Sequence, residues 1–101
     1  MKIKFICAVV KWRDKINGNT YHSVKIIRTS DGKQLASHPI VYGYDTQYRY
    51  TALLTMVKAG WLPSKYTQNN YYEYERDNDY PIYWNITVGL KRDMINNVTG
   101  A

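Results

Sequence analysis

The residues with the clearest capacity for chemistry are two histidines and one cysteine. His22 and His38 fall on neighbouring expected strands, where a shared face would let them bind a metal ion or move protons. No carboxylate or cysteine lies at ligand spacing beside them, which favours ordinary sheet histidines and predicts no metal site. Cys7 would be a nucleophile only with a histidine base, and its apolar neighbours predict a buried, inert thiol. We therefore expect neither enzyme activity nor a cofactor.

A second candidate site is the tyrosine-rich, acidic segment 66–80, in which one arginine stands against four acidic residues. Tyrosine gives a large, rigid contact area with a polar tip, and the carboxylates would repel phosphates, so a protein partner, and a basic one, is expected. Alternation in an extended segment would place Tyr72 and Tyr74 on one side. The alternative is a short helical or irregular cover whose tyrosines pack under the sheet. The residues assigned to this Tyr–acidic surface are Tyr71, Tyr72, Glu73, Tyr74, Glu75, Asp77, Asp79 and Tyr80.

Positive charge is concentrated in the first third of the chain. Residues 1–33 carry eight lysines or arginines against two aspartates, within a net charge of +6 for the whole chain. A basic hairpin attracts polyanions through counterion release, and exposed aromatic side chains beside it can stack on single-stranded bases. The alternative is that these cations only protect strand edges from aggregation. The residues assigned to this basic hairpin are Lys11, Arg13, Lys15, Lys25, Arg28 and Lys33.

Strands are expected to position most of these side chains. Apolar residues on both faces predict a central strand from about Lys2 to Arg13, and Asn17-Gly18 predicts a hairpin into a second strand, "TYHSVKIIRT". Asp31-Gly32 predicts the next turn. Pro39 marks the third strand, "QLASHPIVYGY", as an edge strand or a bulge.

One main helix, "TQYRYTALLTMVKAGW", is expected next, with Asp45 or Thr46 as its N-cap and Gly60 at its end. Its predicted core stripe consists of Tyr50, Leu53, Leu54, Val57 and Trp61.

The final strand, "PIYWNITVGL", alternates between apolar and polar residues, and the tail of about residues 95–101 is expected to fray. The order β-β-β-α-(irregular)-β predicts an α+β fold, with one main helix packed on a mostly antiparallel sheet. The core face predicted for the final strand consists of Ile82, Trp84, Ile86, Val88 and Leu90.

Length and composition indicate one folded domain over residues 1–101, which is 45% hydrophobic and 22% charged. No apolar run approaches the roughly 20 residues that span a bilayer, so no membrane association is expected. A single cysteine and the lack of a signal peptide predict a cytoplasmic protein.

Two resemblances bear on function. Residues 20–60 resemble the strand, Asp-Gly turn, strand and helix of double-stranded RNA-binding domains, although Asp45, Thr46 and Gln47 stand where that family has lysines. The layout "GNTYHSV...DGK...GWLP" in so small a chain is similar to uncharacterised bacteriophage proteins, some of which are anti-defence inhibitors. The second resemblance implies a non-enzymatic inhibitor of a host protein or nucleic-acid machine. We therefore expect a binding protein that uses the Tyr–acidic surface, with nucleic-acid binding through the basic hairpin as the alternative.

Overall fold

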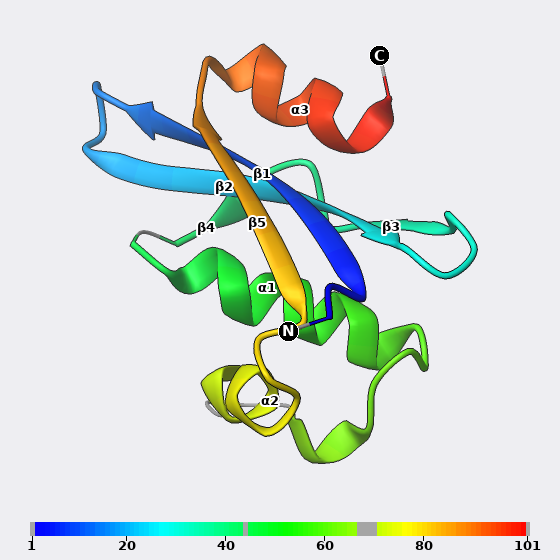
Figure 1. Cartoon of the computed structure of the whole chain (residues 1–101). Coiled ribbons are helices and arrows are strands. Elements are labelled where there is room, and N and C mark those ends of the chain that lie inside the picture. Colours follow the sequence, from blue (N-terminus) through cyan, green and yellow to red (C-terminus); the bar gives the residue numbers. More distant parts are fainter. Residues whose placement is uncertain (1, 44, 67–70, 101) are drawn as a thin grey trace.

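The computed structural model describes residues 2–43, 45–66 and 71–100, which form a mixed sheet with helices on both faces (Figure 1). The strands are β1 (Phe5–Asp14), β2 (Asn19–Arg28), β3 (Gln34–Ala36), β4 (Val41–Tyr42) and β5 (Ile82–Val88). The helices are α1 (Gln47–Lys58), the 3₁₀ turn η1 (Ser64–Tyr66), α2 (Tyr71–Asp77) and α3 (Lys91–Thr99). Within these residues the sheet order is β3-β2-β1-β5, and β4 also pairs with β2. The predicted α+β class with a largely antiparallel sheet is confirmed.

The hairpin predicted at Asn17-Gly18 is confirmed. β1 and β2 pair antiparallel along their whole length, from Phe5↔Arg28 to Asp14↔Asn19. Gly18 adopts a φ of 73°, which glycine reaches without steric cost, and the Asp14 carboxylate accepts hydrogen bonds from the backbone of the turn. β1 begins at Phe5 rather than at Lys2.

The predicted third strand is broken into β3 and β4 around Pro39, which has no N–H for the ladder. Ser37 replaces one ladder contact, because its Oγ accepts a hydrogen bond from Val24 N at 2.9 Å. The chain rejoins β2 at Val41, and Tyr42 then lies opposite Tyr21.

β5 pairs with β1 in parallel, from Phe5↔Ile82 to Lys11↔Val88. The sequence predicted the strand but not this direction, which follows from the route of the chain through α1 and α2 across one face of the sheet (Figure 1). β5 is the last strand of the sheet among the described residues.

Neighbouring residues of β2 show that α1 and α3 lie on opposite faces. His22 contacts Thr51 of α1, whereas the Ser23 hydroxyl donates to Met94 O of α3 at 2.6 Å. Because successive side chains of a strand point to opposite faces, α1 and α3 sandwich β1 and β2 between them (Figure 1). The core on the α1 side contains Cys7, Val9, Val24, Ile26, Ala52, Leu53 and Met56.

The predicted stripe of α1 is confirmed for buried Leu53 and for Trp61, which packs half-buried against the core, but the rest of it is wrong. The helix is turned so that Tyr48, Ala52 and Met56 are buried beside Leu53, and small Ala52 lets it approach the sheet closely. Tyr50, Leu54 and Val57 are only half-buried. The predicted end at Gly60 is confirmed, with Trp61 N donating to Met56 O at 2.9 Å, whereas Thr46 makes no side-chain capping bond.

The prediction of a frayed tail is wrong, because α3 continues to Thr99. Met94 is fully buried, and the Asn97 amide donates to Ala8 O at 3.0 Å and to Ser23 O at 3.3 Å. These polar contacts and the buried Met94 side chain hold the helix on the sheet. None of the helices in the described residues combines the length and apolar character needed to cross a membrane.

The core face predicted for the last strand is wrong beyond its first half. Ile82 is buried and Trp84 half-buried, but Ile86, Val88 and Leu90 are 41%, 82% and 54% exposed. The physical reason is that α1 and α3 cover β1 and β2 and leave the far half of β5 uncovered.

Candidate functional site

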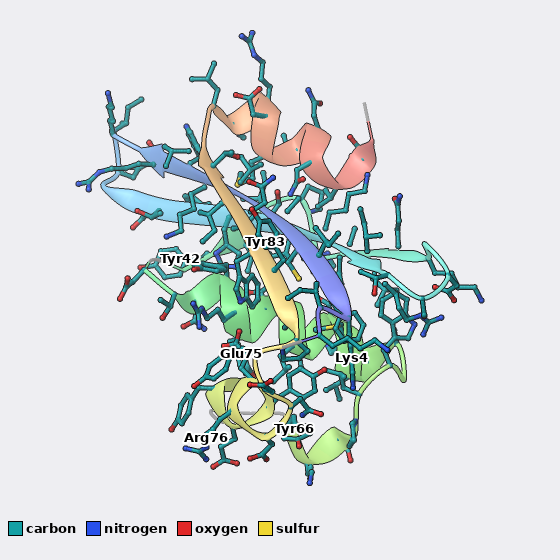
Figure 2. All side chains as sticks on the ribbon, viewed as in Figure 1. Lys4, Tyr42, Tyr66, Glu75, Arg76 and Tyr83 are labelled. Atoms are coloured by element: carbon teal, nitrogen blue, oxygen red, sulfur yellow. The ribbon has the colours of Figure 1, made fainter. Side chains whose placement is uncertain are left out.

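Three aromatic side chains form a row on the α3 face of the sheet, near the hairpin end. The register pairs Trp12 of β1 with Tyr21 of β2, and Tyr21 with Tyr42 of β4, so all three project to one face. The ring centroids of Trp12 and Tyr21 are 5.6 Å apart with planes at 23°, and those of Tyr21 and Tyr42 are 5.7 Å apart at 71°. Tyr42, which is labelled in Figure 2, is 62% exposed, and it stands at one end of the row because Tyr21 lies between it and Trp12. We call these three residues the aromatic row.

Cations lie around the aromatic row. The Nζ atom of Lys91, at the start of α3, is 5.8 Å from the centroid of the Trp12 ring. Lys15 is exposed in the hairpin turn, and Arg13 is exposed at the same end of β1 but, by alternation with Trp12, projects to the α1 face. Lys11 lies on the opposite face, where its Nζ donates to Asp45 O at 2.7 Å and lies 5.0 Å from the Tyr48 ring centroid. Aromatic faces and positive charge are therefore combined at one end of the molecule.

The six residues of the predicted basic hairpin do not form one surface. Arg28 and Lys33 lie at the opposite end of β2 from Arg13 and Lys15, roughly 30 Å away for a strand of this length. Arg28 is also held by Asp31 at 2.7 Å, and the arginine keeps the pKa of this carboxyl low, at about 2. Lys25 projects to the α3 face in the middle of β2. Only the hairpin-end members accompany the aromatic row.

His22 fixes the position of Tyr42. The buried ring donates from Nδ1 to Gly43 O at 3.3 Å, which leaves Nε2 to accept from the Thr51 hydroxyl at 2.7 Å. A side chain at Gly43 would not fit, because its Cβ would lie 2.6 Å from Cγ of Gln47 and φ is 152°. The residue after Tyr42 is thereby tied to both β2 and α1.

The structure does not assemble the residues considered for catalysis or metal binding. His22 is buried under α1, whereas His38 is exposed in the loop between β3 and β4. Burial raises the pKa of the Cys7 thiol to about 12, so the nucleophilic thiolate is suppressed. Within residues 2–43, 45–66 and 71–100, no three His, Cys, Asp or Glu side chains are grouped so as to hold a metal ion.

Stability is expected to fall as the pH is lowered from about 7 to about 5, because burial lowers the pKa of His22 below the value of about 6.5 in the unfolded chain. The unfolded state takes up the proton more readily in this range, so acid favours unfolding. Thermal melts of the His22→Gln variant should show a flatter pH dependence, together with a lower midpoint at neutral pH. His38→Gln is the matched control and should keep the parent slope. An equal slope in the His22→Gln variant would contradict the prediction.

The Tyr–acidic surface is divided between core and surface. Tyr74 and Glu75 are 3% and 4% exposed, whereas Tyr72 and Tyr80 are 55% and 54% exposed. The segment is helical, so Tyr72 and Tyr74 do not share a side, and the prediction from alternation is wrong. In Figure 2 Glu75 lies between α2 and the sheet. Glu73 is half-buried, Asp77 and Asp79 are exposed, and the Tyr71 side chain lies outside the described part of the structure.

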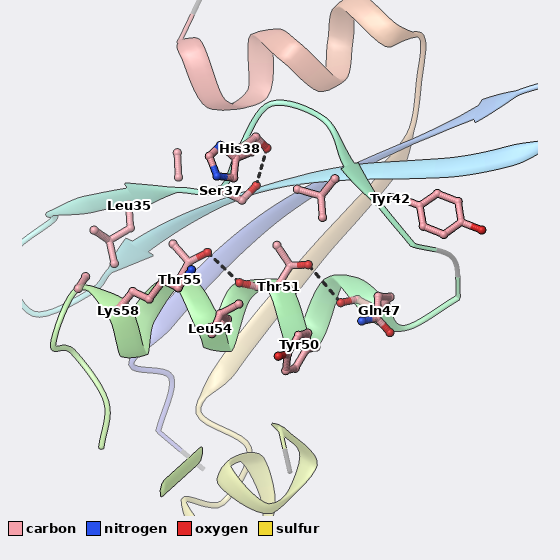
Figure 3. Close-up of a pocket in the computed structure, with 13 residues that line it drawn as sticks. Leu35, Ser37, His38, Tyr42, Gln47, Tyr50, Thr51, Leu54, Thr55 and Lys58 are labelled. Atoms are coloured by element: carbon pink, nitrogen blue, oxygen red, sulfur yellow. Dashed lines mark hydrogen bonds between the residues drawn. The ribbon is translucent and has the colours of Figure 1, made fainter. Parts of the chain in front are cut away.

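A groove of about 600 Å³ separates α1 from the segment that contains β3 and β4 (Figure 3). Its walls include Leu35, Leu54 and Tyr50, and Tyr42 stands at one end. The Thr55 hydroxyl donates to Thr51 O of its own helix at 2.8 Å, and the Thr51 hydroxyl is engaged by His22 Nε2 at 2.7 Å. The groove is thus mainly an apolar depression.

Part of the aromatic row can be inferred from the sequence. A hairpin turn at Asn17-Gly18 places Trp12 opposite Tyr21, but Tyr42 and Lys91 reach the site only through tertiary contacts. No protein-family model matches the chain, and searches of the curated proteins and of the solved structures found no match. The resemblances to bacteriophage proteins and to double-stranded RNA-binding domains therefore stay predictions.

Proposed function

We propose that this protein is a non-enzymatic, cytoplasmic binding protein that holds single-stranded nucleic acid against the aromatic row. The observation that supports the proposal is the row itself: Trp12, Tyr21 and Tyr42 share one face of the sheet, and exposed Lys91 lies against the Trp12 ring. Bases stack on aromatic faces whatever their identity, and neighbouring lysines and arginines bind the phosphates.

The geometry favours single strands over duplexes. A duplex hides the faces of its bases in the stack, whereas an unpaired strand can turn them onto a sheet. Tyr42, at 62% exposure, offers the most accessible ring, and Lys91 beside Trp12 supplies charge at the other end of the row. Sequence preference should be weak, because stacking and phosphate contacts read little of the base edges.

Truncating Tyr42 should weaken binding of a labelled single-stranded oligonucleotide about five- to 150-fold, since stacking contributes roughly 1–3 kcal/mol per base. Fluorescence anisotropy at low salt measures the affinity, and a change in tryptophan emission that is lost in a Trp12→Phe variant reports contact at the row. Tyr72→Ala removes a similarly exposed tyrosine on α2 and should bind as the parent does. A Tyr42→Ala variant with parent affinity, or a parent that shows no binding at low salt, would remove the proposal.

Charge reversal tests the position of the cations. Lys91→Glu, which reverses the cation beside Trp12, should lower affinity and make it less dependent on salt, because fewer counterions are then released. Lys33→Glu makes the same charge change at the opposite end of β2, and it should have the smaller effect. Equal losses from both variants would indicate a diffuse attraction rather than a site at the aromatic row.

A protein partner is the second candidate, through the outward part of the Tyr–acidic surface. The exposure of Tyr72 and Tyr80, together with exposed Asp77 and Asp79, suits a basic protein surface. An inhibitor of a nucleic-acid machine would use both regions, the aromatic row for the strand and the acidic side for the machine.

A further inference from the structure

β5 leaves one edge of the sheet open. It pairs with β1 alone among the described strands, and every residue from Asn85 to Val88 is exposed. Figure 1 shows β5 on the near side of the sheet, with α3 above it and α2 below it. Parallel strand pairs are normally covered on both faces, so a parallel edge strand whose far half is exposed on both faces is unusual.

Half of the β5 backbone faces this open edge. Gly89 N donates to Lys11 O at 2.9 Å, and Pro81 O accepts from Lys4 N at 2.8 Å. The odd-numbered residues therefore turn their N–H and C=O groups toward β1. By the alternation of a strand, Ile82, Trp84, Ile86 and Val88 direct theirs away from β1.

The open edge carries none of the usual protection against strand pairing. Sheets commonly guard an edge with lysine, glutamate, proline or a bulge. Residues 82–90 read "IYWNITVGL" and contain no charged residue and no proline. Tyr83, Ile86 and Val88 are 59%, 41% and 82% exposed, so both faces of the strand offer side chains for a further contact.

We propose that a second copy of this chain occupies the edge, with the two β5 strands pairing antiparallel about a two-fold axis. The register that pairs the whole strand sets Ile82 opposite Val88 and Trp84 opposite Ile86 of the other copy. All four are among the residues whose backbone groups face outward, so the ladder bonds form in this register. The strand is thus complementary to itself, as a two-fold interface requires.

Charge at the two ends of β5 fits the same arrangement. Before the strand Asp77 and Asp79 outnumber Arg76, and after it Lys91 and Arg92 outnumber Asp93. Antiparallel pairing brings the acidic end of one copy beside the basic end of the other. This local attraction opposes the repulsion between two chains that each carry a net charge of +6.

The test measures molar mass by light scattering, without nucleic acid, over a wide range of protein concentration. The parent is expected to reach twice its chain mass of 11.9 kDa. Val88→Pro removes an outward N–H while Gly89 keeps its bond to β1, so it should stay monomeric where the parent is dimeric. Val88→Thr keeps the N–H and the branched side chain, and it should remain dimeric.

Circular dichroism checks that each variant is folded, and Ile86→Lys, which places a charge on the edge, replaces Val88→Pro if the proline variant does not fold. A monomeric parent would overturn the proposal and leave the edge to a strand of another protein. A folded Val88→Pro variant that still dimerises would overturn it as well. Oligonucleotide affinity is measured separately, so the proposed function and this interface fail or succeed independently.

Discussion

Replacing Tyr74 with alanine is expected to lower the free energy of unfolding by about 3–5 kcal/mol, as for other buried aromatic side chains. Tyr74 is 3% exposed, and its ring meets that of Tyr66 edge-on, with centroids 5.1 Å apart. Burial also raises the pKa of its hydroxyl to about 12. The thermal midpoint should fall by more than about 10 °C, measured by circular dichroism.

Tyr72→Ala is the matched control, two residues away on the same helix. Tyr72 is 55% exposed, so its removal should change the free energy of unfolding by less than about 0.5 kcal/mol. Comparing the two variants distinguishes the tyrosine of α2 that covers the core from the tyrosine that is exposed on the surface. Equal melting of the parent and the Tyr74→Ala variant would show that α2 does not pack as described.

Turns were predictable because their signals are local. Asn17-Gly18 and Asp31-Gly32 each contain a glycine at a φ of 73°, a conformation that few other residues reach without strain. The end of α1 at Gly60 is of the same kind. In each case the residue type determines the backbone conformation, independently of the side chains that pack around the turn.

The errors arose where tertiary contacts decide the outcome. The alternation in residues 82–90 predicts a strand, but it cannot show that β5 joins β1 in parallel or that its far half is uncovered. The tail is expected from the sequence to fray because the sequence shows no partner for it, yet Asn97 secures α3 through hydrogen bonds to β1 and β2. The spacing of tyrosines and acids in 71–80 fits a helix as well as an extended segment, and packing against Tyr66 makes it helical.

The aromatic row likewise combines features set by local sequence with features set by tertiary contacts. Hairpin pairing is local and sets Trp12 opposite Tyr21, whereas Tyr42 depends on the buried His22 and on Gly43. The lysines and arginines that are close in the sequence do not form one surface, because the ten residues of β2 place them at opposite ends of the strand. Charge along a chain predicts a surface only after the register is known.

The largest electrostatic effect is expected at Glu75, which sequence reasoning assigned to a protein-binding surface. The carboxylate is 4% exposed; Oε2 accepts from Arg49 Nη1 at 2.8 Å and Oε1 accepts from Trp84 Nε1 at 2.7 Å. Among the described residues, the buried Arg49 Nε already has no hydrogen-bond partner. Removing the carboxylate would leave a half-buried cation and an indole N–H unpaired. Glu75→Ala should therefore lower the free energy of unfolding by about 3–5 kcal/mol, measured by urea denaturation.

Two further variants separate charge from hydrogen bonding. Glu75→Gln keeps an acceptor for Trp84 but loses the attraction to Arg49, so its loss should be smaller than that of Glu75→Ala. Replacing both partners, with Glu75→Leu and Arg49→Met together, should recover much of the stability, because no uncompensated charge then remains. The cost of Glu75→Ala would then lie mainly in the stranded arginine. If Glu75→Ala unfolds at the same urea concentration as the parent, Glu75 is a surface residue, and the sequence-based assignment to a partner-binding surface regains its support.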